Sequence, residues 1–288
     1  MKVADTAKFQ LENFEVIDIP SLIDLSNSVG WDYDESEIKT IMSSGKIYGY
    51  RNEIGEIICS AAIVEYDSKL ASIGMVIVRQ DYQGMGLGKK ATQKCIESIP
   101  SSTTIMLIAT EEGKPMYEKM GFSSVDSIQK FICKTYETSY TNVKSIKIKA
   151  YNEKDFTQLI QIDKEAFGDD RKTFLLNRIK QSKVALVAKD SNGKVIAYGL
   201  SISGPVNLIL GPIVAPDSEA ALAIVDELVK NHQGKLRIDV PSGNEEFIAQ
   251  LIKCGFSKVG QPPIMIKNSV ELPFRNKTLY SIAAQIFG

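Results

Sequence analysis

The sequence has little of what several common kinds of site require. One histidine, His232, and four cysteines occur among its 288 residues. A single histidine makes histidine-based catalytic triads and multi-histidine metal sites poor hypotheses. The cysteines lie far apart in apolar contexts, a pattern of neither a disulfide framework nor a zinc site, and one that indicates a reducing compartment. We therefore expect no metal ion.

Excess charge and long apolar runs are also missing. The 34 basic residues nearly balance the 35 acidic ones, and the formal net charge is −1. No global field therefore draws the chain to nucleic acid or to an anionic membrane. No apolar run is long enough to span a bilayer, and residues 1–20 contain no signal-peptide core. We expect a cytoplasmic protein with no nucleic-acid or membrane partner, either a monomer or a homodimer.

What the chain does have is an order of predicted elements that occurs twice. Each half contains a strand-like stretch, a helical segment, a hairpin, an apolar strand and a short helix that ends at Gly-Phe. A repeat on this scale indicates duplication of one α+β unit. The polar run 137–142 marks the linker, which predicts domains at 1–138 and 139–288. The matched segments are 14–17 and 146–149, 19–29 and 156–167, 47–58 and 184–196, 105–110 and 236–240, and the Gly-Phe pairs at 121–122 and 255–256.

The strongest functional pattern lies at residues 76–90. The segment is predicted to be a strand, then a loop with alternate glycines at Gly84, Gly86 and Gly88, then a helix. Glycine allows such a loop to turn several backbone N–H groups toward one point. Together with the positive end of the helix, these groups would bind a phosphate or pyrophosphate.

Two well-known phosphate loops fit this segment poorly. A P-loop would need glycine at Gln83 and serine or threonine at Lys90. A Rossmann fingerprint would need glycine at Lys89 and an almost immediate turn from strand to glycine, whereas residues 79–83 intervene. The Rossmann reading stays open as a weaker alternative, because Glu111 could serve as the ribose-binding acid.

A third pattern fits throughout. The run 83–88, Gln-Gly-Met-Gly-Leu-Gly, matches the Gln/Arg-x-x-Gly-x-Gly/Ala signature of the GNAT N-acetyltransferase superfamily, which the chain resembles. The predicted helix after it carries Leu87, Ala91, Cys95 and Ile99 on one face. The strand 105–110 comes next, and residues 114–122 are similar to the closing Tyr-Glu-Lys-x-Gly-Phe element of that family.

This resemblance implies two tandem GNAT-like domains of the α+β class, each a mixed, mostly antiparallel sheet flanked by helices. It implies acetyl-CoA as co-substrate and an N-acetyltransferase that acts by direct attack in a ternary complex. The acceptor would be the primary amine of a small molecule or a peptide. The resemblance also implies that the main chain of Val76, Ile77 and Val78 pairs with the pantetheine arm. The pyrophosphate would bind the amides of Gly84, Met85, Gly86, Leu87, Gly88 and Lys89, beside the Gln83 side chain.

Catalytic and acceptor residues are further expectations. Tyr117 occupies the place of the family's acid tyrosine and would protonate the leaving thiol. Glu65 is the first candidate base, with Glu111, Glu112 and a chain of water molecules as alternatives. Trp31 and Tyr33 lie in an acidic, aromatic segment between the first two predicted helices, where the resemblance implies the acceptor site and where aromatic rings and acids would suit a cationic amine. A helix cap at Asp32 or Asp34 with two packed rings is the alternative for this segment.

The second half lacks the loop. Ala220, Leu222 and Ile224 stand where the first half has its three glycines, and Leu251 replaces the tyrosine. We therefore predict one competent acetyl-CoA site, in the first half, and a degenerate second half that packs against the first and shapes the acceptor cleft. The apolar tail, residues 278–286, is expected to dock back on the body. A non-catalytic acetyl-CoA sensor is the alternative function, and a blocked acceptor cleft would favour it.

Overall fold

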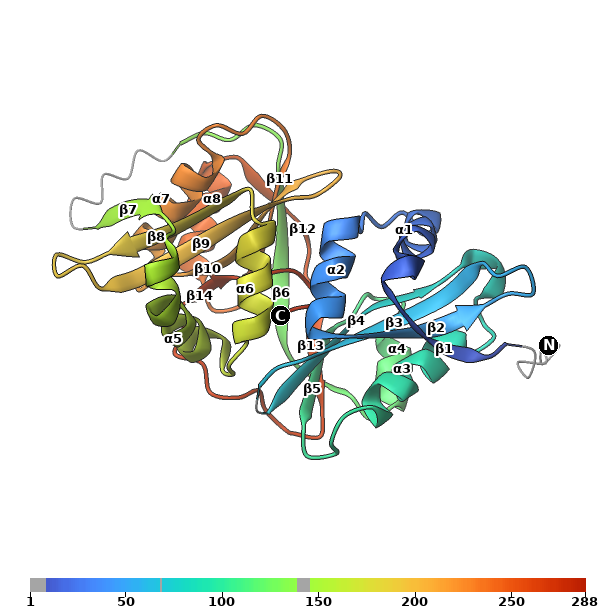
Figure 1. Ribbon diagram of the computed structural model, residues 1–288. Coiled ribbons are helices and arrows are strands. Elements are labelled where there is room, and N and C mark those ends of the chain that lie inside the picture. Colours follow the sequence, from blue (N-terminus) through green and yellow to red (C-terminus); the bar gives the residue numbers. More distant parts are fainter. Residues whose placement is uncertain (1–8, 68, 139–145) are drawn as a thin grey trace.

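The computed structural model describes residues 9–67, 69–138 and 146–288, and within these ranges the repeat is visible element by element (Figure 1). Both halves run strand, two helices, three strands, helix, strand, helix, strand. The first half comprises β1 (Leu11–Phe14), α1 (Ile19–Ser28), α2 (Glu35–Ser44), β2 (Gly45–Arg51), β3 (Ile57–Glu65), β4 (Leu70–Val78), α3 (Leu87–Glu97), β5 (Thr104–Ile108), α4 (Lys114–Lys119) and β6 (Ser123–Cys133). The second comprises β7 (Lys147–Ala150), α5 (Phe156–Phe167), α6 (Lys172–Gln181), β8 (Val184–Lys189), β9 (Val195–Ser203), β10 (Leu208–Val214), α7 (Ser218–Val229), β11 (Leu236–Pro241), α8 (Glu245–Lys253), β12 (Phe256–Gly260), β13 (Pro263–Lys267) and β14 (Leu279–Ser281).

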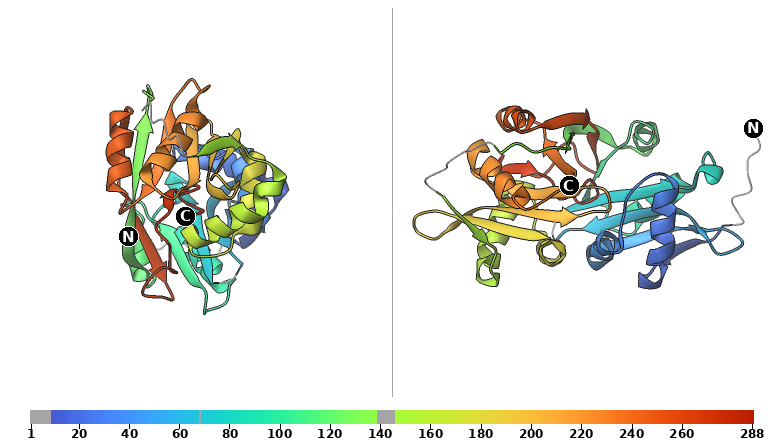
Figure 2. Two further views of the ribbon diagram at one scale, coloured as in Figure 1. Left: turned by 90° about the vertical axis from the view of Figure 1, so that its left-hand side faces the viewer. Right: turned by 90° about the horizontal axis from the view of Figure 1, so that it is seen from above.

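The described strands form one continuous 14-stranded sheet between two layers of helices (Figure 2). Helices α1, α2, α5 and α6 share one apolar core, while α3 and α4 pack in a second and α7 and α8 in a third. Neighbouring strands are mostly antiparallel, and β4–β5 and β10–β11 are the parallel pairs among them. Because both faces are covered, central strands are apolar throughout, and eight of the nine residues of β3 are buried.

The two halves exchange strands where they meet. Strand β13, from the second half, lies between β5 and β6 of the first and pairs with both. Strand β6 pairs with β13 over residues 123–127, and over residues 128–133 it pairs with β11 and β12 of the second half. Each half therefore completes the sheet of the other. The boundary at 138/139 stays a prediction, and most of the proposed linker, residues 139–142, lies outside the described residues.

The tail docks back on the body, as predicted. Leu279–Ser281 form β14 on the edge of β10, and the last residues run to the junction of the halves, where the C-terminus lies in Figures 1 and 2. There the side chain of Ile286 packs over Gly74 of β4.

One local prediction is wrong. Residues 14–17 do not form a single strand, because β1 ends at Phe14 and Val16–Asp18 form a 3-10 turn. The Asp18 carboxylate accepts a hydrogen bond from the Glu15 N–H at 2.9 Å, which closes this turn before α1 begins. Ile17 is 85% exposed, so its side chain does not belong to the core. Among the described helices, none is long and apolar enough to cross a membrane.

Candidate active site

The glycine loop joins β4 to α3 and leaves the N-terminus of that helix open. Gly84 and Gly86 have φ of 79° and 76°, in the left-handed region that side chains disfavour. Apart from chain neighbours, a β-carbon at either glycine would have no heavy atom within 4 Å. Gly86 is the N-cap of α3, and no side chain of the described residues caps the helix. Unsatisfied N–H groups at a helix start are a ready site for an anion.

Beside this loop, β4 and β5 diverge. They pair only from Leu70 to Ile73, after which β5 turns toward β13 and the Ala109 N–H bonds the carbonyl of Pro263. The Arg79 N–H bonds the carbonyl of Ile58 on β3 at 2.9 Å. Since successive N–H groups of a strand point to opposite sides, those of Val78 and Val76 face the opening between β4 and β5. This open edge has the length and polarity to pair with an extended amide-containing ligand.

Gln83 contacts the same edge. Its side-chain Nε2 donates to the carbonyl of Val78 at 3.2 Å. The side chain therefore ties the start of the loop to the end of β4.

In the second half, the corresponding opening is filled by the chain itself. Strands β10 and β11 pair up to Leu210 and then separate, and β14 lies in the gap. The Ala215 N–H bonds the carbonyl of Thr278 at 3.0 Å, and the Ile282 N–H bonds that of Asp239 at 3.0 Å. Neither strand edge is left open at this point.

The helix beyond that opening is also closed. Asp217 caps α7, and its Oδ1 accepts from the Ala220 N–H at 2.8 Å. A carboxylate thus occupies the position at which an anion would bind the first half. Leu251, which replaces the tyrosine in this half, is fully buried.

Tyr117 belongs to α4 and lies in the apolar cluster beneath α3. It is 7% exposed, and its ring meets that of Phe122 edge-on at 5.9 Å between centroids. Burial, with a smaller contribution from Cys95, raises the pKa of the Tyr117 phenol well above its ordinary value. The phenol therefore keeps its proton throughout the neutral and mildly basic range.

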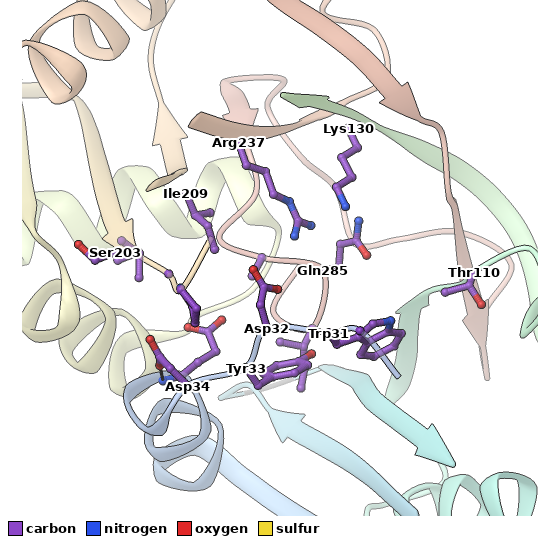
Figure 3. Close-up of a pocket in the computed structure, with 17 residues that line it drawn as sticks. Trp31, Asp32, Tyr33, Asp34, Thr110, Lys130, Ser203, Ile209, Arg237 and Gln285 are labelled. Atoms are coloured by element: carbon purple, nitrogen blue, oxygen red, sulfur yellow. Dashed lines mark hydrogen bonds between the residues drawn. The ribbon is translucent and has the colours of Figure 1, made fainter. Parts of the chain in front are cut away.

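A pocket of about 280 Å³ lies on the other face of the sheet, between the two halves (Figure 3). Trp31 and Tyr33 line it, with ring centroids 6.2 Å apart. Thr110, just beyond β5, lines it as well, so the pocket reaches the opening between β4 and β5. The remaining lining residues include Asp32, Asp34, Glu37, Lys130, Ser203, Ile209, Arg237 and Gln285.

The segment 31–34 is held in place by the ends of α1 and α2. The Trp31 N–H donates to the carbonyl of Ser26 at 3.1 Å, and the Tyr33 N–H donates to the Ser26 hydroxyl at 3.2 Å. Asp34 caps α2 by accepting from the Glu37 N–H at 2.7 Å. Burial first, and then the Glu37 carboxylate, raise the pKa of Tyr33 above its usual value. Tyr33 therefore lines the pocket as a neutral phenol.

The structure does not bring Glu65 to this pocket. Glu65 ends β3 opposite Ala71, near the start of β4, whereas the glycine loop follows the other end of β4. At about 3.3 Å per residue, seven residues of strand separate the two by roughly 20 Å. The side chain is exposed. Glu111 and Glu112 are exposed between β5 and α4.

Sequence reasoning missed the polar and charged residues that the second half and β6 contribute. Lys130 comes from β6, Arg237 from β11 and Gln285 from the tail. A signal was present in β11, because Arg237 and Asp239 alternate with apolar residues there. Such alternation marks one polar face, but it does not indicate what that face adjoins.

Comparison with known proteins agrees with this architecture. Two models described as acetyltransferase (GNAT) domains match residues 33–132 and 159–281. An uncharacterized N-acetyltransferase of Bacillus subtilis, YitH, is 37% identical over 271 residues, which are 94% of this chain and 95% of that protein.

Solved structures show the same fold. A candidate acetyltransferase from Pyrococcus horikoshii superposes with a TM-score of 0.81 at 20% identity, over 98% of this chain and 96% of that one. A tandem GNAT protein from the clavulanic acid biosynthesis pathway gives a TM-score of 0.67 at 10% identity, over 92% and 100% of the two chains.

Proposed function

The chain belongs to the GNAT acetyltransferase superfamily, and on that premise we propose that it transfers the acetyl group of acetyl-CoA to a primary amine through one donor site, in its first half. The contrast between two helix starts carries the proposal. Helix α3 begins at a left-handed glycine with no side-chain cap from the described residues, whereas α7 begins at Asp217, which bonds its own helix. Only the first arrangement leaves amides for a pyrophosphate.

In the proposed complex, the amides of residues 84–89 hold the pyrophosphate of acetyl-CoA. The pantetheine arm pairs with the open edge of β4 through Val76 and Val78. The N–H of Val78 donates to the thioester carbonyl, where negative charge develops in the transition state. The side chain of Gln83 keeps the end of β4 in place for this contact.

The chemistry is a direct acyl transfer. The neutral amine attacks the thioester carbon, its lone pair forms the new C–N bond, and the oxygen becomes an oxyanion beside the Val78 N–H. When the oxyanion collapses and the C–S bond breaks, the sulfur takes the electron pair of that bond and receives the phenolic proton of Tyr117. The amide nitrogen releases a proton to solvent, from which Tyr117 is reprotonated. Glu65 has no part in this proposal, because β3 carries it to the far end of the sheet.

The acceptor would enter through the pocket between the halves. Trp31 and Tyr33 offer apolar ring faces for its carbon skeleton, and Thr110 connects the pocket with the opening that would hold the thioester. This access supports an enzyme over a sensor, since a sensor needs no second cavity beside the thioester.

The test is thiol release from acetyl-CoA with a panel of primary amines, together with calorimetric binding of CoA. We expect CoA to bind and at least one class of amine to release thiol with formation of the N-acetyl product. CoA binding with no turnover on any amine would instead support the sensor. Absence of CoA binding, with binding of NAD, would restore the Rossmann alternative and overturn the proposal.

A further inference from the structure

The pocket between the halves has a cationic wall that the strand exchange creates. In the pairing of β6 with β11, Lys130 lies opposite Asp239. Arg237 is two residues before Asp239 on the same strand, so its side chain projects from the same face. Figure 3 shows Lys130 and Arg237 pointing toward the cavity from neighbouring strands. One cation therefore comes from each half.

These two cations are not equally neutralised. Arg237 pairs with Asp239 through Nη2–Oδ2 at 2.5 Å and Nε–Oδ1 at 3.2 Å. The Lys130 ammonium makes no hydrogen bond or ion pair with the described part of the chain, although the carboxylates of Asp239 and Asp32 are near enough to favour its charge. Burial, and then the charge of Arg237, lower the pKa of Lys130. An anion bound against this wall would pair with the Lys130 ammonium and favour its charged form.

The opposite wall is acidic, and most of its carboxylates already have partners. Asp34 caps α2, and Glu37 pairs with Arg178 and accepts from Gln181 Nε2 at 3.0 Å. Asp32 makes no hydrogen bond within the described residues, and in Figure 3 its carboxylate stands between the Trp31 and Tyr33 rings and Arg237. Asp32 is therefore the carboxylate best able to take a new cationic partner.

The size of the cavity limits what can bind across these walls. Its volume of about 280 Å³ is at the lower end of the roughly 300–1,000 Å³ typical of small-molecule sites. The 31–34 segment, strands β6, β9, β10 and β11 and the tail all contribute to its walls. These dimensions favour a small molecule over a lysine presented by a folded protein.

We propose that the acceptor is a small zwitterion, that is, a primary amine that also carries a carboxylate or phosphate. Its anionic group binds Lys130 and Arg237, and its amine lies between Asp32 and the opening beside Thr110. This inference rests on the proposed function and adds the substrate class. A neutral or purely cationic amine would leave the half-buried Lys130 unpaired, and a site that loses such a polar partnership discriminates against the ligand that fails to restore it.

The first experiment measures acetyl transfer with matched acceptors that differ only in the anionic group. One arm compares amino acids with their carboxamides, and the other compares aminoalkyl phosphates with the corresponding amino alcohols. We expect kcat/KM to be at least about tenfold higher for the anionic member, as an added charged hydrogen bond implies. The arm with the larger ratio identifies carboxylate or phosphate as the recognised group.

The second experiment uses Lys130→Met, which keeps the length of the side chain and removes its charge. KM for the anionic acceptor should rise about tenfold or more, while kcat and the KM of the neutral analogue stay the same. Lys149→Met, on the exposed face of β7, is the matched control and should change neither value. Arg237→Gln should act in the same direction as Lys130→Met. Calorimetric binding of CoA checks that each variant is folded.

The outcomes separate the two levels of the proposal. Equal kcat/KM for anionic and neutral acceptors, or a Lys130→Met effect of the same size on both, would overturn the zwitterion and leave acetyl transfer intact. Failure of every acceptor in the panel, anionic or neutral, would overturn the proposed function itself.

Discussion

The hydroxyl of Ser281 donates to the carbonyl of Leu210 at 2.7 Å, where β10 and β11 part. The bond holds β14 in an opening whose counterpart in the first half, between β4 and β5, has no such strand within the described residues. The two copies of one unit thus differ in whether the chain fills its own cleft. The backbone groups along the edge of such a cleft need hydrogen-bond partners, and either a strand of the chain or a bound ligand can supply them. Where β14 supplies them, in the second half, a ligand has no edge to pair with.

We predict one CoA site per chain. The open amides of α3 and the free edge of β4 offer a site, whereas Asp217 and β14 close the equivalent positions in the second half. Calorimetric titration of the full-length protein with CoA should give a stoichiometry near one. Two equivalent sites would contradict the assignment of a degenerate second half.

Gly86→Ala should weaken CoA binding by about tenfold or more, because a side chain at φ of 76° is strained by about 1–3 kcal/mol, which would shift the loop amides proposed to hold the pyrophosphate. Calorimetry with CoA measures the change. Gly193→Ala is the matched control, since Gly193 has φ of 81°, has equally open surroundings and lies in the β8–β9 turn. Equal CoA affinity of the two variants would show that the loop is not the donor site.

Tyr117→Phe should lower kcat by roughly 100-fold, within the range for loss of a general acid, and leave the affinity for CoA unchanged. The edge-on contact with Phe122 needs only the ring, so the fold should be retained. Tyr48→Phe, a buried phenol of the same cluster on β2, serves as control. A Tyr117→Phe variant with the wild-type kcat would assign proton delivery to another group.

The pH dependence follows from the raised pKa of Tyr117. An acid must be protonated to act, and a raised pKa extends its protonated range upward. The rate should therefore rise as the acceptor amine loses its proton and show no downturn up to about pH 10, the ordinary tyrosine value. Measurement of kcat at saturating acceptor across this range tests it, because kcat does not depend on acceptor binding by Lys130, and a downturn that disappears in Tyr117→Phe would indicate a phenol that is not shifted.

The strand exchange predicts that neither half folds alone. Without residues 139–288, β5 and β6 lose β13, which lies between them. Fragment 1–138 should therefore aggregate or lack cooperative unfolding, while co-expression with 139–288 should yield one complex on size-exclusion chromatography. A fragment 1–138 that unfolds cooperatively and binds CoA would contradict this.

Asp163→Asn should destabilise the protein by about 3–5 kcal/mol, the usual cost of leaving a buried charge without its partner. Arg171 is buried and donates to both Asp163 carboxylate oxygens at 2.8 Å. It also donates to the carbonyl of Gly288 at 3.2 Å, so the change loosens the tail that lines the pocket. Urea unfolding measures the loss, and Glu35→Gln, in an exposed pair with Lys39, should cost at most about 1 kcal/mol.

Features encoded locally could be predicted from the sequence. The glycine run, the helix face of Leu87 and Ala91, and the Gly-Phe helix ends depend on neighbours a few residues away, and the structure contains each of them. The duplicated order of elements was visible for the same reason. The misassigned residues 14–17 show the limit of such patterns, because a short apolar run does not distinguish a strand from the turn that Asp18 closes.

By itself, the sequence determined the family, the repeat and the half that carries the glycine loop, because each of these follows from spacing along the chain. Only the tertiary structure decided which strands complete which half and which side chains face the pocket between the halves. Lys130 and Arg237 are more than a hundred positions apart, and they become neighbours only because β6 pairs with β11. Strand pairing depends on edges that any compatible strand can occupy, so the partner is chosen by the packing of the whole sheet and not by local sequence.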